Sequence, residues 1–140
     1  IAKVKPDVFN HNLETVPRIY KQIRPGSNYI ESLKLLREVK EFDRSIFTKS
    51  GIMVGLGEDY SEIIEVLKDM KDSNIDFVTI GQYLQPSIHH EKVHKFYSPD
   101  EFKSLYNVCL KLGFKMISSS PMTRSSYHAD EDFEKLKKVV

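Results

Sequence analysis

The chain has 140 residues, of which 40% are hydrophobic and 29% are charged, so it is long enough for one compact domain and too short for two of full size. The 21 Lys and Arg residues nearly balance the 20 Asp and Glu residues, and the net charge of +1 gives no case for a nucleic-acid partner. No apolar run approaches the roughly 20 residues of a membrane helix, and a single cysteine excludes an internal disulfide. Because the first residue is Ile and no targeting segment follows, we expect a fragment of a longer, soluble protein.

The first third of the sequence alternates an extended segment with a helix. Residues 4–9 favour a short strand, and a dense polar cluster follows at 10–15. A connecting turn or short helix over 16–24 ends at Pro25 and Gly26, which are strong turn residues. Asn28 with Glu31 three residues later is typical of a helix start, and apolar residues at helical spacing then predict an amphipathic helix up to about Phe42.

The middle of the sequence repeats this alternation. Residues 46–54 form a β-branched and apolar segment followed by Gly55 and Gly57, which predicts a strand and a tight turn. Asp59 would begin the next helix, whose apolar stripe ends near Met70. The run 77–81 is nearly all apolar, as expected of a strand buried on both faces.

The last third contains the clearest helix start of the chain. Residues 87–97 lack periodicity and are expected to form a loop. Ser98, Pro99 and Glu101 are the residue types that begin a helix, and Gly113 is expected to end it. A strand is predicted over 114–117, a polar loop over 118–130, and a short charged helix or frayed tail over 131–140.

This order of elements predicts an α/β fold of parallel βα units with right-handed crossovers. A full eightfold barrel takes about 250 residues, so the chain is at most half of a TIM-type barrel, or a small open sheet. We expect about three parallel βα units plus a C-terminal strand, in a single domain over residues 1–140 whose part 114–140 is a C-terminal extension. In either architecture, ligands bind beyond the carboxyl ends of the strands.

Polar residues and glycines follow each predicted strand. Gly51, Gly55 and Gly57 would let a ligand approach the backbone closely, or they are ordinary turn residues. The polar residues at the same edge are Asn10, His11, Asn12, Glu14, Glu58, Gln82, Tyr83, Gln85 and those of the 118–130 loop.

Several residues allow more than one chemical interpretation. Glu14 and Glu58 could act as general acid and base, but they could equally cap a turn or bind a ribose. His89, His90 and His94 are close in sequence, yet three histidines in an irregular basic loop are more often solvated than bound to a metal.

Three further groups contain nucleophilic side chains. Cys109 lies on the apolar face of a predicted helix and is expected to be a small buried hydrophobe. Lys49 could be a Schiff-base lysine on a barrel strand. The run 124–130 contains Ser and His residues, but their spacing alone does not indicate a hydrolase.

Four runs taken together resemble the lipoyl synthase family, and the resemblance covers nearly the whole chain. They are residues 6–18, 48–58, 79–86 and 124–130, and they correspond to the C-terminal half of that family. Lipoyl synthases belong to the radical S-adenosylmethionine superfamily, whose fold is a partial (β/α)6 barrel. The resemblance implies that this chain supplies the last three strands and the C-terminal extension.

The resemblance also implies a binding site for S-adenosylmethionine. Residues 51–58 are similar to the superfamily's Gly-x-Ile-x-Gly-x-x-Glu strand, with Met53 in the Ile position, which supports the adenosine end of the ligand. Residues 10–14 match the polar fourth strand that contacts the ribose or the methionyl part, and residues 82–86 would lie beside the adenine. The expected cofactor-binding residues are Asn10, Asn12, Glu14, Lys49, Gly51, Gly55, Glu58, Gln82 and Gln85.

In this family the enzyme is a sulfurtransferase that inserts two sulfur atoms into an octanoyl chain on a carrier lysine, which makes the lipoyl cofactor. One 4Fe-4S cluster cleaves S-adenosylmethionine, and an auxiliary 4Fe-4S cluster is the sulfur source. The family's Arg-Ser-Ser-Tyr motif, here Arg124–Tyr127, supplies a serine oxygen to an iron of the auxiliary cluster. We expect Ser125 as that metal ligand, with Ser126 as the alternative, and Arg124 as a cation that favours the deprotonated oxygen.

The chain departs from the family because both triplets of cluster-binding cysteines are absent. We therefore expect that the chain alone binds neither cluster, has no turnover and has only half of an S-adenosylmethionine site. An open barrel edge predicts self-association. The implied partners are octanoylated lipoyl carrier domains, as found in 2-oxoacid dehydrogenases and the glycine cleavage H protein, and a low-potential electron donor, with no nucleic acid and no membrane. The implied compartment is the cytoplasm, or the mitochondrion in a eukaryote.

Three other hypotheses remain from the sequence. The chain could belong to a different radical S-adenosylmethionine enzyme, or to a barrel lyase that uses Lys49 as a Schiff base. It could also be a non-catalytic module that binds only a carrier domain or a nucleotide.

Overall fold

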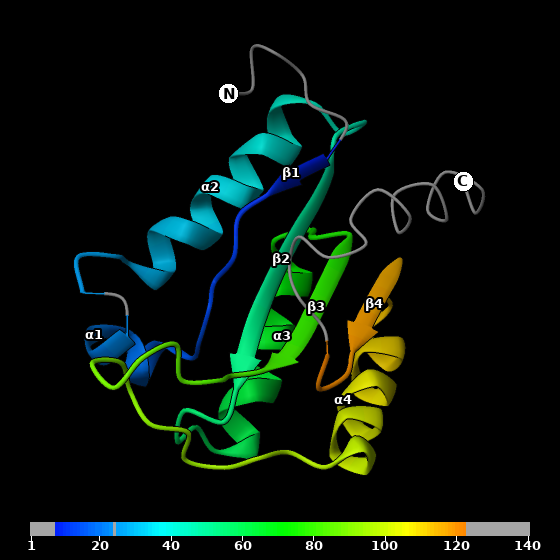
Figure 1. The fold of residues 1–140 in the computed structure, drawn as a ribbon. Helices are drawn as coiled ribbons and strands as arrows, with labels where there is room; N and C mark the ends of the chain where they lie inside the picture. Colours follow the sequence, from blue (N-terminus) through cyan, green and yellow to red (C-terminus); the bar gives the residue numbers. More distant parts are fainter. Residues whose placement is uncertain (1–7, 24, 123–140) are drawn as a thin grey trace.

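The computed structural model describes residues 8–23 and 25–122, which form a parallel sheet and its connecting helices (Figure 1). A short 3-10 helix, Pro17–Ile19, precedes α1. In chain order the other elements are β1 (Val8–Asn10), α1 (Tyr20–Ile23), α2 (Tyr29–Phe42), β2 (Phe47–Val54), α3 (Tyr60–Asp72), β3 (Phe77–Gln82), α4 (Pro99–Leu112) and β4 (Met116–Ser119).

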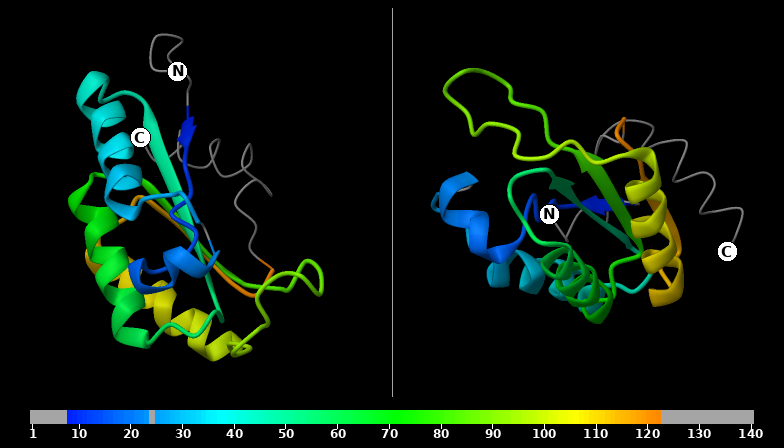
Figure 2. Two further views of the ribbon diagram at one scale, coloured as in Figure 1. Left: turned by 90° about the vertical axis from the view of Figure 1, so that its left-hand side faces the viewer. Right: turned by 90° about the horizontal axis from the view of Figure 1, so that it is seen from below.

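The four strands are all parallel and are arranged in the order β1-β2-β3-β4, so each strand pairs with its neighbour in sequence. Figure 2 shows α2, α3 and α4 on one face of this sheet. Parallel neighbours joined by helices on one face are the repeating unit of an α/β barrel. The predicted α/β class with parallel βα units is therefore confirmed.

The helices begin and end where the capping residues predict. The Asn28 side chain accepts a hydrogen bond from the backbone N–H of Glu31 (3.1 Å) at the start of α2. Ser98 and Glu101 bond each other's backbone N–H groups at the start of α4, at 3.1 and 3.0 Å. Gly113 ends α4 with a φ of 90°, in the left-handed region that favours glycine.

The last described strand begins later than predicted. The expected strand covered residues 114–117, whereas β4 is Met116–Ser119, so Ser118 and Ser119 belong to the strand and not to the following loop. Phe114 is buried, and the backbone N–H groups of Lys115 and Met116 both donate to the Asp76 carbonyl at 3.1 Å. The chain therefore joins the sheet only from Met116. The predicted segments at 1–7 and 123–140 lie outside the described residues.

The strand β1 is short, but the chain stays beside β2 after it ends. The His11 N–H donates to the Lys49 carbonyl (3.0 Å), and the Glu14 N–H donates to the Gly51 carbonyl (3.0 Å). Glu14 adopts a φ of 78° and its carbonyl accepts from the Met53 N–H (2.8 Å). The polar cluster after β1 is thus held against β2 as far as Glu14.

The two faces of the sheet have different surroundings. Ile52, Val54 and Ile80 are at most 3% exposed and pack in the core with the helices. The opposite face, which we call the inner face, carries the alternate residues, because successive side chains of a strand point to opposite sides. In Figure 1, β2 and β3 lie in front of α3, so this view looks onto the inner face. Its residues in the three longer strands include Lys49, Gly51, Met53, Phe77, Thr79, Met116 and Ser118.

A glycine in β2 allows the inner face to pack. Gly51 is the register partner of Thr79 on β3, and a Cβ added at Gly51 would lie 2.0 Å from the Thr79 Oγ1 atom. The Thr79 side chain therefore occupies the space that a side chain at position 51 would need.

We expect Gly51→Ala to lower the free energy of unfolding by about 1–3 kcal/mol, the usual cost of overpacking a core. Because Thr79→Ala removes the clashing oxygen, the same Gly51→Ala change should cost clearly less in a Thr79→Ala background. Equilibrium urea unfolding of the four chains of this double-mutant cycle measures the coupling. An equal cost of Gly51→Ala in both backgrounds would show that Thr79 is not the constraint.

Candidate functional site

The carboxyl ends of β2, β3 and β4 point toward one edge of the sheet, the lower edge in Figure 1. β1 ends higher, beside Lys49, and the segment after it runs along β2 toward the same edge. We call this edge the rim. It consists of the segment after β1 (residues 10–15), the turn after β2 (residues 55–58), the end of β3 with the following residues 83–85, and the end of β4.

A buried carboxylate organises the turn after β2. Glu58 is a residue with 9% exposure, and its side chain accepts hydrogen bonds from the backbone N–H groups of Gly55 (3.0 and 3.1 Å) and Leu56 (3.0 Å). It also accepts one from the Tyr97 hydroxyl (2.8 Å). Gly55 and Gly57 both have positive φ, 109° and 102°, so the turn needs residues without a side chain at these positions. Glu58 thus satisfies backbone donors that the turn would otherwise leave without partners.

A buried amide joins β3 to the segment before α4. The Gln82 Nε2 atom donates to the carbonyls of Tyr83 (2.9 Å) and Lys95 (3.0 Å), and its Oε1 atom accepts from the Tyr97 N–H (2.9 Å). A Cβ on Gly55 would lie 2.4 Å from Gln82 Nε2 and 2.5 Å from the Lys95 carbonyl oxygen. Gly55 therefore allows Gln82 to cross the end of β2.

Tyr97 connects the carboxylate and the amide. Burial, and then its hydrogen bond to Glu58, raises the pKa of the Tyr97 hydroxyl well above its usual value. The hydroxyl therefore stays protonated at any physiological pH and donates a hydrogen bond to the Glu58 carboxylate. We call Glu58, Gln82 and Tyr97 the rim network.

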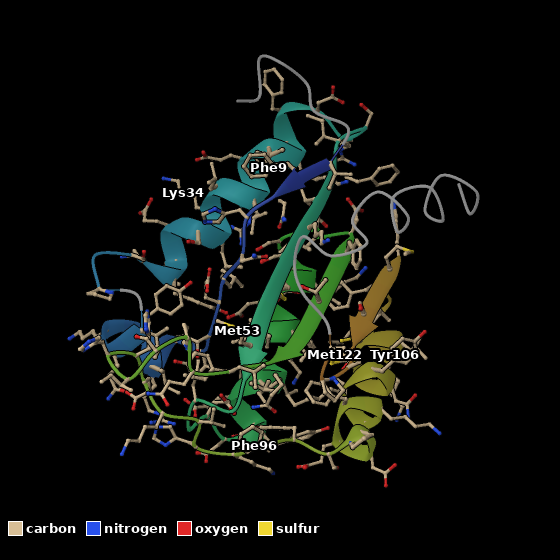
Figure 3. All side chains as sticks on the ribbon, viewed as in Figure 1. Phe9, Lys34, Met53, Phe96, Tyr106 and Met122 are labelled. Atoms are coloured by element: carbon tan, nitrogen blue, oxygen red, sulfur yellow. The ribbon has the colours of Figure 1, made fainter. Side chains whose placement is uncertain are left out.

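The loop between β3 and α4 begins and ends at the rim network. The first residues of the loop bond to its middle. The Tyr83 hydroxyl donates to the Glu91 carbonyl (2.6 Å), and the Gln85 side chain donates to the His90 carbonyl (3.0 Å). Figure 2 shows the loop projecting from the edge of the sheet, and Figure 3 places Phe96 at the end of this loop that precedes α4. The rim network thus fixes both ends of an exposed loop.

The inner face next to the rim carries a polar atom without a partner. Asn12 Oδ1 is buried and accepts no hydrogen bond from the part of the chain that the structure describes. It lies 3.3 Å from the point where a Cβ on Gly51 would be, so it is directed at the inner face of β2. A buried acceptor without a donor costs free energy, and a ligand with a hydroxyl or amino group could supply that donor.

The structure separates the predicted cofactor-binding residues into three groups. Asn12, Lys49 and Gly51 lie on the inner face, where Lys49 is 1% exposed and its Nζ atom is 4.5 Å from the centre of the Phe77 ring. Gly55, Glu58 and Gln82 form or adjoin the rim network. Asn10 is exposed at the end of β1, Glu14 lies beside β2, and Gln85 is exposed on the loop.

These positions leave the cofactor-binding assignments as predictions. Arg124 and Ser125, together with the alternative ligand Ser126, lie outside the described residues.

The described residues contain no cluster suited to a metal ion. Across residues 8–23 and 25–122, no group of three His, Cys, Asp or Glu side chains could hold one. His90 instead bonds Ser87 (2.8 Å), and His94 bonds Glu91 (3.4 Å). Cys109 is fully buried, and burial raises the pKa of its thiol to about 12. The described residues therefore offer no thiolate to an iron–sulfur cluster.

The role of Tyr97 was not predicted from the sequence, although a signal was present. Tyr97 precedes the helix-capping residue Ser98, and its ring is 6.0 Å from that of Phe102 in the first turn of α4. An apolar contact across a helix start is a known pattern, the hydrophobic staple. That pattern would have placed Tyr97 in the core.

None of the described helices is long and apolar enough to cross a membrane.

We expect Tyr97→Phe to lower the free energy of unfolding by about 1.5–3 kcal/mol, because it removes a hydrogen bond to a buried carboxylate. Tyr106→Phe on the exposed side of α4 (Figure 3) is the matched control, since it removes a hydroxyl that is far from any carboxylate of the rim. Urea unfolding of both variants measures the difference. If Tyr97→Phe were as mild as the control, Glu58 would not depend on this hydroxyl.

Comparison with known proteins shows the fold. No family model matches the sequence. The structure of Streptococcus suis SuiB bound to precursor peptide SuiA matches 81% of this chain with a TM-score of 0.60 and 14% identity. The structure of methylornithine synthase (PylB) matches 95% of it with a TM-score of 0.61 and 15% identity.

The chain spans 26% of the SuiB chain and 50% of the PylB chain. Both neighbours are radical S-adenosylmethionine enzymes built on TIM-type barrels, so the predicted partial-barrel architecture is confirmed. At this level of identity the comparison establishes that the chain has the fold of part of such a barrel.

Proposed function

We propose that this chain is the C-terminal part of lipoyl synthase, the radical S-adenosylmethionine enzyme that inserts two sulfur atoms into a protein-bound octanoyl chain. The fold likeness to radical S-adenosylmethionine enzymes supports the superfamily. The four sequence runs at 6–18, 48–58, 79–86 and 124–130 support the family. In this proposal the rim and the adjacent inner face hold the nucleoside part of S-adenosylmethionine.

The observation that carries the proposal is the buried Oδ1 atom of Asn12 above Gly51. This polar atom finds no donor among the described residues, and it faces Gly51 on the inner face, three residues before the carboxyl end of β2. Ligands of α/β barrels bind beyond those carboxyl ends. A ribose hydroxyl is a donor of suitable chemistry. The rim network would keep the turn after β2 and the loop after β3 in place around it, and so would position the ligand without contacting the reacting atoms.

S-adenosylmethionine and the two clusters would supply the radical chemistry and the sulfur atoms when bound. Residues 8–23 and 25–122 would contact only the nucleoside part, because they have no accessible thiolate for a cluster. The chain alone is therefore proposed to bind nucleoside weakly and to have no turnover. Iron ligation by Ser125 or Ser126, and docking of octanoylated carrier domains, remain parts of the same proposal.

We expect Asn12→Leu to abolish binding of S-adenosylmethionine and of adenosine while leaving the fold intact. Leu has nearly the shape of Asn, and it removes a buried acceptor without a partner, so the free energy of unfolding should stay the same or rise by about 1 kcal/mol. Isothermal titration with each nucleoside gives the affinity, and urea unfolding gives the stability.

The matched control is Asn107→Leu, which makes the same change at an exposed position of α4. The proposal predicts that this control keeps nucleoside binding. Unchanged nucleoside affinity in Asn12→Leu, or an outright loss of stability in that variant, would assign Asn12 a purely structural role.

A barrel lyase is the second candidate, because Lys49 is buried on the inner face, on the ligand side of the sheet. A lysine amine in such a position can form a Schiff base with a carbonyl substrate. Borohydride reduction in the presence of pyruvate, followed by peptide mass spectrometry, would then find an adduct on Lys49 in the native chain and none in Lys49→Arg. The lipoyl synthase proposal predicts no adduct on Lys49.

A further inference from the structure

A polar cleft lies at the opposite edge of the sheet, away from the rim. It has a volume of about 410 Å³, within the usual range of small-molecule sites. Its lining comes from the end of α2 and the following turn, from the end of α3, and from the residues just before β3 and β4. The charged residues that line it are Lys40, Glu41, Arg44, Lys71, Asp76 and Lys115.

One carboxylate in this cleft is already neutralised. Asp76 is 5% exposed, and its Oδ2 atom accepts from Lys40 Nζ (2.5 Å) and from the Thr48 N–H (2.9 Å). Lys115 Nζ lies 3.4 Å from the other oxygen, but 52% of the Lys115 side chain is exposed. Lys40 makes the closer of the two ion pairs with Asp76, and the more distant, half-exposed Lys115 can turn toward a ligand in the cleft.

Two further cations have no carboxylate partner in the cleft. Lys71 Nζ donates to the neutral carbonyl of Gly113 (3.0 Å) and lies 5.8 Å from the centre of the Phe114 ring, and it forms no ion pair with a carboxylate of the described residues. Arg44 is exposed and forms no ion pair within the described part of the chain. Four cations and two carboxylates give the cleft an excess of two positive charges, whereas the whole chain has a net charge of only +1.

We propose that this cleft binds a small dianion of the phosphate or phosphate-monoester class. Arg44 would hold two phosphate oxygens with its planar guanidinium, and Lys71 and Lys115 would add single charges. The charge of a dianion matches the excess in the cleft. Glu41 and the negative ends of α2 and α3 oppose an anion, so we expect weak binding, on the order of millimolar.

Titration with inorganic phosphate at constant ionic strength tests the site, with chloride as the reference anion. Amide chemical shifts should saturate around residues 40–44, 71–76 and 113–115 with phosphate and should not saturate with chloride. A phosphate monoester, glycerol phosphate, forms a parallel arm. Equal affinity for the two phosphates identifies a site for the free ion, and tighter binding of the monoester shows that the cleft also recognises the organic part.

Arg44→Ala should weaken phosphate binding about tenfold, the loss expected for one charge-assisted hydrogen bond. Lys71→Met should have a similar effect. Lys68→Met is the matched control, because it removes the same charge from the same helix outside the cleft. Urea unfolding without phosphate checks that each variant is folded, and Arg44→Ala covers the case in which Lys71→Met fails to fold.

Phosphate and chloride shifts of equal size, or an equal loss of affinity in Lys68→Met, would overturn the proposal. This test is independent of nucleoside binding at the rim, since the two sites lie at opposite edges of the sheet.

Discussion

The rim depends on one buried interaction, the contact of the Glu58 carboxylate with two backbone N–H groups and the Tyr97 hydroxyl. The hydroxyl comes from a residue 39 positions later in the chain, so this carboxylate joins the turn after β2 to the entrance of α4. Gln82 makes the equivalent link from β3. The ends of β2 and β3 and the loop between β3 and α4 are therefore fixed relative to one another. This arrangement keeps the rim beside the inner face in one conformation.

Contacts within the protein explain why the run 51–58 contains glycines at positions 51 and 55, and no ligand is needed for this explanation. Gly51 makes room for Thr79, and Gly55 makes room for Gln82 and the Lys95 carbonyl. The close contacts that the resemblance connects with adenosine are made here by protein atoms. The atom that does require an outside partner is Asn12 Oδ1, which comes from the segment after β1. In our account the glycine-rich run forms one side of the binding site, and Asn12, in the polar segment after β1, makes the hydrogen bond to the ligand.

Local patterns predicted the order of the elements because each depends on residues close together in the sequence. The caps at Asn28 and Ser98 and the end of α4 at Gly113 are examples. The rim network was not predicted, because Glu58, Gln82 and Tyr97 meet only after the strands have paired. The same reason explains the late start of β4, which is set by the Asp76 carbonyl on a neighbouring segment.

The most direct test of the account is to map adenosine binding on the isotopically labelled chain by amide chemical shifts. The account predicts saturable shifts at Asn12, at residues 51–55 and at Gln82, on the inner face and rim. Shifts confined to residues 71–76 and 113–115 at the opposite edge, or no saturable shift at Asn12 at the highest soluble adenosine concentration, would contradict it.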